Sequence, residues 1–505
     1  MFKSKIGNCI TVTFALLLLS VVPTILGNSS IIQSASAQTE ATSPAPTNDT
    51  LQAQGSDEVR LPSQVGFSVS LLATNFSVPH NILYGADDAL WITERFGKNI
   101  TRVDPNNGSE LSSMPVPNVH QSEGQDGLMG MAFDPDFNNN TNYIYVAYTY
   151  DADTGEELDR LTKITRFTYD AATSTIGEPM DLISGLSGST DHNSGRMTFG
   201  PDGKLYYTIG DQGANYLSNY CLDIQAQDLP TAEQVAAGNW SAYEGKVLRM
   251  NPDGSIPADN PVINGVLSHI FTYGHRNAQG IAAGPNGGLY ISEHGETSDD
   301  EVNRLQAGGN YGWPYVAGYN DSQAYQYVNW SAAENCEELM FNPIAPPPPG
   351  VPVVNESQFE AENFVPPLRT FYTVENGYNF TDPACGGDLA YVCWPTVAPS
   401  SLRLYMSDVI PGWENTFLMT TLKAGRIFQL ALNENGTALT SDPVELFRSE
   451  NRYRDVAFDP DGRTIYVITD SFGPAQAIEG GATDDLWNPG SLLVFRYERD
   501  GSTRQ

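Results

Sequence analysis

MTFGPDGKLYYTIGD, residues 197–211, is the stretch that decides the fold of this chain. A short apolar run leads into a Pro-Asp-Gly turn, and the chain then continues as a run rich in aromatic and β-branched residues. This pattern predicts a β-hairpin, because aspartate and glycine adopt the backbone angles of a tight turn. The same phrase recurs in MAFDPDFNNNTNYIYVAY from Met131, IAAGPNGGLYISEHG from Ile281 and VAFDPDGRTIYVITD from Val456.

Two less regular copies complete the set of repeats. ILYGADDALWITE begins at Ile82, and the segment 401–432 contains a further strand at Thr416–Met419. Units of a few antiparallel strands cannot bury their faces alone, so six of them predict an all-β, six-bladed β-propeller with four-stranded antiparallel blades and long inserted loops. A β-sandwich of unrelated hairpins is the alternative, but roughly 450 residues exceed the size of one sandwich. Helical periodicity is nearly absent, so we expect any helix to be short and to lie in a loop.

The N-terminal residues have the pattern of an export signal. Lys3 and Lys5 precede an apolar run from Ile10 to about Ile25, and the small residues Ala35-Ser36-Ala37 follow. We expect cleavage after Ala37, although an uncleaved membrane anchor is the alternative interpretation. The predicted organisation is a signal peptide at 1–37, a flexible linker at 38–60 and a catalytic propeller at 61–500.

Charge and cysteine content indicate a secreted or otherwise extracytoplasmic protein. The formal net charge is -34, which repels phosphate backbones and makes nucleic acid a poor partner. Most of the surplus carboxylates fit a soluble surface, and a few are candidates for calcium binding. Four cysteines follow the signal, an even number typical of an oxidising compartment. Cys385 and Cys393 are close in sequence and are expected to form a disulfide that closes a small loop. A Cys221–Cys336 disulfide is suggested only because these are the two remaining cysteines.

Two short segments concentrate arginine. GHRNAQG (274–280) contains Arg276, and NRYRD (451–455) contains Arg452 and Arg454. Exposed arginines are usually solvated, but arginine is also the side chain best suited to hold planar, oxygen-rich anions through paired donors. The arginines are therefore candidates for an anion site.

From about Leu61 to Tyr497 the chain resembles the soluble, pyrroloquinoline-quinone (PQQ)-dependent glucose dehydrogenases of the glucose/sorbosone dehydrogenase family. The motifs that carry the resemblance occur in order: DHNSGR (191–196), IGDQGANYL (209–217), GKVLRMNPDGSIPADNP (245–261), GHRN (274–277), GGNYGWPYVAGYND (308–321), NFVPPL (363–368), YVCWPTVAPSS (391–401) and NRYRD (451–455). The resemblance implies a six-bladed propeller with PQQ lying flat over the channel mouth, together with calcium. It also implies that the anomeric hydroxyl of an aldose is oxidised to a lactone.

The resemblance assigns roles to individual residues. His192 matches the general base, with Asp191 as a neighbouring carboxylate, and Arg276 matches a cation that stabilises the charge developing on the quinone. The residues expected to contact the cofactor are Gln125, Arg276, Asn277, Lys423, Arg452, Arg454 and Thr396. The positions that face the sugar are Tyr216, Leu217, Tyr391 and Trp394. Tyr216 replaces the glutamine that bonds sugar hydroxyls in the family. The resemblance therefore supports oxidation of an aldose more strongly than it supports glucose as the particular substrate.

Calcium is expected at two places. Gly295 and Glu296 align with the Gly-Pro pair whose carbonyls bind the ion that touches the quinone, and Glu296 adds a negative charge where the family has proline. A structural calcium pair is expected at residues matching Glu301, Tyr311, Ala317, Asp321 and Glu356. A solvated acidic loop is the alternative interpretation of Asp299, Asp300 and Glu301.

Two other classes of protein stay open at this point. A calcium-dependent lactonase and a non-catalytic glycan-binding propeller would each use a channel mouth, but neither requires a histidine base opposite an arginine cluster. The chain lacks the CxxCH motif for haem attachment, so we expect electrons to leave to an external acceptor that is soluble or membrane-associated. The sequence leaves open whether the chain forms a homodimer.

Overall fold

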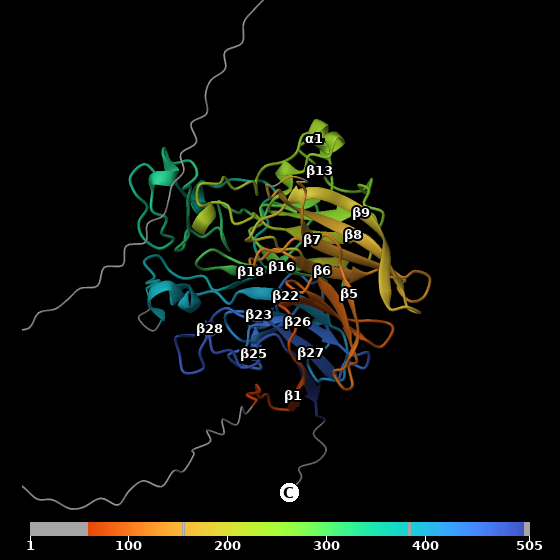
Figure 1. Cartoon of the computed structure of the whole chain (residues 1–505). Helices are drawn as coiled ribbons and strands as arrows, with labels where there is room; N and C mark the ends of the chain where they lie inside the picture. Colours follow the sequence, from red (N-terminus) through yellow and green to blue (C-terminus); the bar gives the residue numbers. More distant parts are fainter. Residues whose placement is uncertain (1–58, 154, 156, 382–384, 499–505) are drawn as a thin grey trace, which may run out of the picture. The chain divides into compact units, whose positions relative to one another are not determined.

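The structure is a computed structural model that describes residues 59–498, apart from 154, 156 and 382–384 (Figure 1). The predicted signal peptide and nearly all of the predicted linker lie outside the described residues. Six four-stranded antiparallel sheets dominate this part of the chain. The prediction of a six-bladed, all-β propeller is therefore confirmed.

The first two blades have short connections, whereas the third carries a long segment with short helices between its second and third strands and a hairpin between its third and fourth strands. Blade 1 contains β2 (Pro79–Tyr84), β3 (Leu90–Glu94), β4 (Asn99–Val103) and β5 (Glu110–Pro115). Blade 2 contains β6 (Leu128–Phe133), β7 (Tyr143–Asp151), β8 (Arg160–Asp170) and β9 (Thr175–Ser187). Blade 3 contains β10 (Met197–Phe199), β11 (Leu205–Ile209), β12 (Lys246–Met250) and β15 (Ile270–Tyr273).

Blade 4 carries the longest insertion, between its third and fourth strands, and blade 6 closes the ring. Blade 4 contains β16 (Ala278–Ala283), β17 (Leu289–Glu293), β18 (Asp300–Arg304) and β21 (Arg369–Phe371). Blade 5 contains β22 (Pro399–Tyr405), β23 (Thr416–Thr421), β24 (Ile427–Ala431) and β25 (Val444–Leu446). Blade 6 contains β26 (Tyr453–Phe458), β27 (Thr464–Thr469), β30 (Leu492–Tyr497) and β1 (Phe67–Ala73). The pairing of β1 with β30 joins the two ends of the described chain, as the adjacent red and dark blue strands in Figure 1 show.

Each sequence repeat forms the first two strands of one blade. In the repeat at 197–211, Met197 pairs with Tyr207 and Phe199 with Leu205 across the hairpin β10–β11. Gly203 in its turn has a φ of +68°, a backbone angle that favours glycine. All five residues of β11 are buried, because neighbouring blades cover both faces of the second strand.

A separate hydrophobic cluster fills each of the six interfaces between neighbouring blades. Between blades 1 and 2, for example, the fully buried Trp91 packs in one cluster with Ile144 and Val146. Burial of one such side chain contributes roughly 1.5–3 kcal/mol, so the stability of a blade depends on both of its neighbours.

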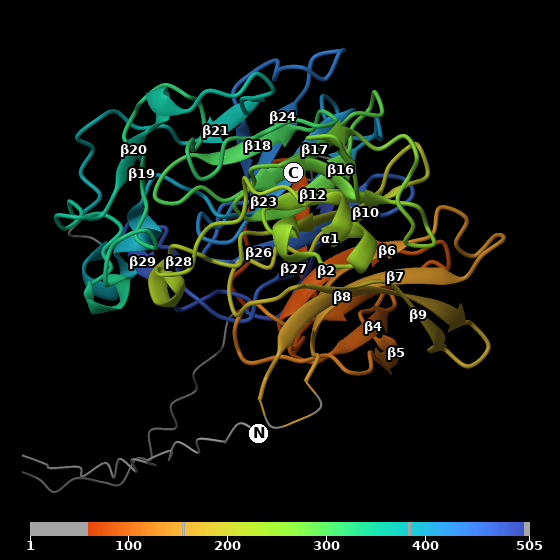
Figure 2. The same ribbon diagram turned by 90° about the horizontal axis from the view of Figure 1, so that it is seen from above.

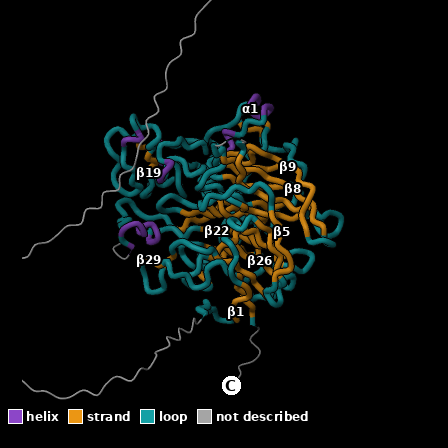
Figure 3. The backbone as a smooth tube through the Cα atoms, in the orientation of Figure 1, coloured by secondary structure: helices purple, strands orange, loops and turns teal. Residues whose placement is uncertain are grey.

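The remaining elements are short and lie in the loops between strands, as Figure 3 shows. Three two-stranded hairpins are inserted: β13 (Val262–Ile263) with β14 (Val266–Leu267), β19 (Gln326–Val328) with β20 (Val353–Asn355), and β28 (Ala475–Gln476) with β29 (Ala482–Thr483). The helical segments are α1 (Ala232–Ala237), η1 (Leu217–Asn219), η2 (Ser241–Tyr243), η3 (Cys336–Glu338), η4 (Glu356–Gln358) and η6 (Gly387–Cys393). Figures 1 and 2 both place β28 on the opposite side of the propeller from β5 and β9. None of the helices in the described residues is long and apolar enough to span a bilayer.

Arg196 occupies the hub of the propeller. This fully buried side chain precedes β10, and its guanidinium donates to acceptors on four other blades: the carbonyls of His80, Gln279 and Ser400 and the carboxylate of Asp455. Blade 2 touches the same point through Gly130, where an added Cβ would lie 2.2 Å from the carbonyl oxygen of Gly195. One side chain therefore connects the innermost strands around the ring.

Replacement of Arg196 by methionine is expected to lower the free energy of unfolding by about 3 kcal/mol or more, because buried carbonyls and the buried Asp455 lose their donor. Urea unfolding followed by circular dichroism would measure the loss. The exposed Arg496 on β30 provides the control, since Arg496→Met should change stability by less than about 0.5 kcal/mol. Equally small losses in the free energy of unfolding for the two variants would contradict the stabilising role of Arg196.

Candidate active site

The candidate residues lie at one end of the propeller channel because of how the blades are built. A hairpin places the residues before its first strand beside those after its second strand. His192 precedes β10, Arg276 and Asn277 precede β16, and Arg452 precedes β26. The residues that follow the second strands are Asp211 after β11, His294 after β17, Lys423 after β23 and Asp470 after β27. Four blades thus deliver polar side chains to the same rim.

His192 is held by a carboxylate that the sequence analysis did not single out. Its Nδ1 lies 2.7 Å from Oδ1 of Asp211, and both side chains are buried. The other carboxylate oxygen of Asp211 accepts a hydrogen bond of 2.9 Å from the indole nitrogen of Trp313. This pair of contacts fixes the imidazole and leaves Nε2 as the ring nitrogen available to a ligand.

Asp191 does not have the orienting position that its place in the sequence suggested. Its Oδ1 lies 3.8 Å from Nε2 of His192, beyond hydrogen-bond distance, and accepts a hydrogen bond from the side-chain amide of Gln125. Adjacent residues point in different directions here, since His192 has a φ of +44°. Asp211 could have been found from the repeat itself, because it is the aspartate that ends MTFGPDGKLYYTIGD.

Arg276 is held by aromatic rings. The carbon at the centre of its guanidinium lies 5.3 Å from the ring centroid of Tyr216 and 5.3 Å from that of Trp313. Arg276 is 4% exposed, and its Nε has no hydrogen-bond partner among the described residues. Stacking positions this cation beside His192 without neutralising it. Asn277, the next residue, accepts hydrogen bonds from Ser194 and Gln279.

Arg452 and Arg454 share one carboxylate. Arg454 forms a salt bridge with Asp470, and Nε of Arg452 lies 3.9 Å from the same oxygen. Nε of each arginine lacks a partner in the described part of the chain. Burial, only partly opposed by Asp470, lowers the pKa of Arg452. This excess of buried positive charge fits a ligand with several carboxylates.

Lys423 is fully enclosed by oxygen acceptors. Its Nζ donates to the carbonyls of Tyr391 and Trp394 and to the hydroxyl of Thr396. Burial lowers the pKa of Lys423 to about 8, while the charge of Asp300 raises it. Lys423 thus ties the segment that carries the candidate substrate residues to blade 5.

His294 links these groups into one site. Its pKa is lowered well below the usual value by burial and then by the charges of Arg276, His192 and Arg454, which all lie within electrostatic range. The structure therefore brings together the predicted base, the predicted quinone-facing cation and one predicted carboxylate-binding arginine.

The wall at the mouth of the site is aromatic. The rings of His192 and Tyr216 are stacked with centroids 6.1 Å apart, and Phe341 packs edge-on against Tyr216 at 5.6 Å. Leu217 and Tyr391 are largely exposed, whereas Trp394 is buried beside Lys423.

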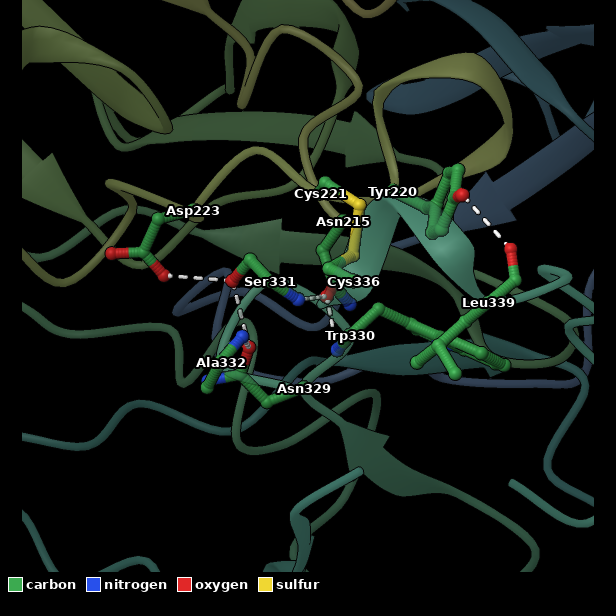
Figure 4. The surroundings of a disulfide bond; sticks show 10 residues. All are labelled: Asn215, Tyr220, Cys221, Asp223, Asn329, Trp330, Ser331, Ala332, Cys336 and Leu339. Carbon is green, nitrogen blue, oxygen red and sulfur yellow. Dashed lines mark hydrogen bonds between the residues drawn. A yellow bond between two sulfur atoms is a disulfide. The ribbon is translucent and has the colours of Figure 1, made fainter. Parts of the chain in front are cut away.

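Figure 4 shows how the loop that carries Tyr216 is anchored. The disulfide Cys221–Cys336 joins it to the insertion between β18 and β21, with the two Cα atoms 5.7 Å apart. Asn215 accepts a hydrogen bond of 2.7 Å from the backbone of Trp330, and the hydroxyl of Tyr220 donates to the carbonyl of Leu339 over 2.9 Å. A second disulfide joins Cys385 and Cys393. The covalent link therefore fixes the loop that carries Tyr216 and Leu217, two of the predicted substrate residues.

The predicted calcium residues do not form a cluster of side chains. Among the described residues, no three His, Cys, Asp or Glu side chains converge as metal ligands. Glu301 accepts from the backbone of Gly318 at 2.6 Å, and Glu356 accepts from Ala317 at 3.2 Å and from Ser322 at 2.8 Å. The hydroxyl of Tyr311 donates to the carbonyl of Arg304 instead. A calcium ion bound here would therefore need backbone carbonyls among its ligands. The sequence resemblance implied main-chain ligands for some of these residues.

The carboxylates of this region nevertheless fit a nearby cation in charge. Burial is the main cause that raises the pKa of Asp299 to about 6 and that of Glu356 to about 7, and Asp321 raises both further. Burial also raises the pKa of Glu301 well above its usual value. Near the imidazole, burial raises the pKa of Glu296 to about 7, although the charge of Arg276 opposes the rise. Asp299, Glu301 and Glu356 have no salt-bridge partner within the described residues, so their ionised forms lack a stabilising positive charge.

Comparison with known proteins gives consistent results. The family described as Glucose / Sorbosone dehydrogenase matches residues 76–364 and 380–476. The chain is 49% identical to Quinoprotein glucose dehydrogenase B of Acinetobacter calcoaceticus over 439 residues, which cover 86% of this chain and 91% of the relative. It is 28% identical to an aldose sugar dehydrogenase of Escherichia coli, over 70% of this chain and 77% of that protein.

A solved structure shares the fold. The PQQ-bound form of an aldose sugar dehydrogenase from Streptomyces coelicolor superposes with a TM-score of 0.56 and 24% sequence identity. The match covers 86% of this chain and 99% of that chain. At this level of identity the likeness supports the propeller fold alone.

Without calcium, the protein is expected to become less stable as the pH rises from about 4.5 to 7. In this window Asp299, Glu296 and Glu356 keep protons in the folded state that the unfolded chain has released, so the free energy of unfolding falls with pH. Calcium should remove most of this fall, because a cation favours ionised carboxylates. Calorimetric melting temperatures at pH 5, 6 and 7, in EDTA and in calcium, would measure both effects.

Glu356→Gln is the matched variant for this experiment, since it removes one of the titrating groups and keeps the shape of the side chain. It should flatten the pH dependence in EDTA and weaken the response to calcium. A melting temperature in EDTA that rises between pH 5 and 7 would contradict the prediction.

Proposed function

Because the chain belongs to the glucose/sorbosone dehydrogenase family, we propose that it oxidises the anomeric hydroxyl of an aldose to a lactone, with PQQ as cofactor. The observation that carries this proposal is the arrangement of His192 and Arg276. A buried imidazole fixed by Asp211 and a guanidinium that forms no salt bridge within the described residues both lie against the ring of Tyr216. Such a pair suits removal of a proton from a hydroxyl while negative charge develops nearby.

His192 acts as the general base in this proposal. Its Nδ1 faces Asp211, so Nε2 accepts the proton of the anomeric hydroxyl, and the carboxylate stabilises the imidazolium that results. Trp313 holds Asp211 from the other side. Asp191, the residue before His192 in the sequence, instead accepts a hydrogen bond from the side-chain amide of Gln125.

The cationic groups bind and orient the cofactor. Arg452 and Arg454 outnumber Asp470, so they retain donors for carboxylates of the quinone, and Lys423 supports the neighbouring segment. When bound, PQQ would supply the two-electron acceptor that oxidation of the sugar requires. Calcium is proposed beside the carbonyl of Gly295 and the side chain of Glu296, because burial raises the pKa of Glu296 to about 7 despite the opposing charge of Arg276.

Tyr216 shapes the substrate site. Burial raises its pKa to about 12, so its hydroxyl remains a hydrogen-bond donor at neutral pH. Its ring lies beside Arg276 and is fixed by Phe341. A ring at this position supports stacking on a pyranose face, and we propose that the aldose binds between Tyr216 and the exposed Tyr391.

The test of the proposed function is reconstitution of the purified protein. With calcium and PQQ added, aldoses should reduce an artificial acceptor dye, and the sugar should bleach the absorption band of the oxidised cofactor. Protein that binds sugar but leaves the band and the dye unchanged would favour a glycan-binding propeller. Release of acid from lactones without dye reduction would favour a hydrolase.

His192→Gln is expected to reduce kcat by ~100-fold or more, the usual contribution of a positioned base, while affinity for PQQ stays nearly unchanged. Steady-state kinetics and a PQQ titration followed by fluorescence would measure the two quantities. Asp211→Asn should also lower kcat, and more strongly than Asp191→Asn, because only Asp211 contacts the imidazole within hydrogen-bond distance. A kcat for His192→Gln close to that of the wild type would rule out the base.

A further inference from the structure

Arg95 is a buried arginine that neither the sequence analysis nor the catalytic proposal uses. It directly follows β3, the second strand of blade 1. This is the place in blade 1 that corresponds to Asp470 in blade 6, after β27, and to His294 in blade 4, after β17. The construction of the propeller therefore puts Arg95 on the same rim as the candidate active site, beside blade 6.

The side chain of Arg95 is enclosed and has no polar partner. The residue is 5% exposed, and its guanidinium makes no hydrogen bond or salt bridge to any residue that the structure describes; its buried Nε is one of the unpartnered atoms. Its backbone is fixed on both sides, with its nitrogen bonded to the carbonyl of Val78 and its carbonyl to the nitrogen of Leu128. The guanidinium lies near the ring of Phe96, 5.5 Å from the centroid.

Arg196 shows what a buried arginine normally requires. It is equally enclosed, yet it donates to three carbonyls and one carboxylate. Burial of a cation without such partners costs several kcal/mol. The environment of Arg95 is thus incomplete in a way that the environment of Arg196 is not.

The charges around Arg95 do not balance. Arg452 and Arg454 lie within electrostatic range, and the carboxylates in range are Asp470 and Asp126. Asp470 already pairs with Arg454, and Asp126 pairs with Arg160 at 2.9 Å. Burial lowers the pKa of Arg95 to about 10, with further lowering by Arg454 and Arg452 against the attraction of Asp470, so the group is still protonated at neutral pH. The three arginines therefore lie within electrostatic range of one another, and Asp470 is the carboxylate that they share.

We propose that Arg95 acts together with Arg452 and Arg454 and binds a carboxylate of the tricarboxylated quinone. This inference rests on the proposed function. A guanidinium offers two parallel donors to a carboxylate, and such charge-assisted bonds are among the strongest available in a water-excluded site. The three arginines come from blades 1 and 6, the pair that closes the ring, so the bound anion would also bridge this closure.

The experiment is a PQQ titration of the metal-loaded apoprotein, followed by tryptophan fluorescence. Arg95→Met should weaken PQQ affinity by ~10-fold to 100-fold, as expected for loss of a charge-assisted hydrogen bond. Arg102→Met is the matched control in the same blade, because the guanidinium of Arg102 pairs with Asp87 and stacks on Trp91. Its PQQ affinity should equal that of the wild type. Arg95→Lys, which keeps the charge but not the paired donors, should fall between the two.

A second readout separates ligand binding from a structural role. Removal of an unpartnered buried charge should leave the melting temperature of the apoprotein unchanged or raise it, whereas the rise in melting temperature on adding PQQ should shrink. Arg95→Met with wild-type PQQ affinity, or with a destabilised apoprotein and an unchanged PQQ-induced shift, would overturn the inference alone. A wild-type protein that binds no PQQ would overturn the proposed function and this inference together.

Discussion

The whole propeller depends on the contacts of Arg196 at its hub. Blades of a propeller are joined side by side, and the six hydrophobic clusters between them are each local to one interface. Arg196 acts across the ring, because its guanidinium donates to blades 1, 4, 5 and 6. Asp455 reinforces it by also accepting from Asn81 and Arg403. The first strands are thereby fixed around one point, and the residues at their ends acquire defined positions.

The rim above this hub carries two opposite kinds of unbalanced charge. On the side of blades 1 and 6, Arg95, Arg452 and Arg454 share Asp470. On the side of blade 4 and its insertion, Glu301 and Glu356 are buried without a cation beside them. A polycarboxylate and a divalent cation would complement these two regions respectively. His192 and Arg276 lie on the rim contributed by blades 3 and 4, where burial strengthens the electrostatic effect of each charge.

Local patterns predicted the parts of the site that belong to single hairpins. The six repeats gave the correct first hairpin of every blade, since turn residues and alternating burial are properties of neighbouring residues. The arginines of GHRN and NRYRD could be singled out because each lies in a short polar run of contiguous residues. Asp211 ends one of the repeats, but its contact with His192 could not be assigned in this way, and neither could the surroundings of Arg95. The sequence shows Arg95 only as a charged residue after a strand. It also does not show that Asp211 contacts Nδ1 of His192 while Asp191 lies 3.8 Å from Nε2.

The sequence by itself determined the all-β propeller, the number of blades and the family, because repeated turn chemistry and ordered motifs are written in contiguous residues. Only the tertiary structure decided which charged groups have partners. Arg95 and Arg196 are both arginines beside apolar strands, yet one is satisfied by four acceptors and the other by none in the described chain. The difference arises because closure of the ring places residues from distant blades side by side, and the balance of charge at a point depends on all of them.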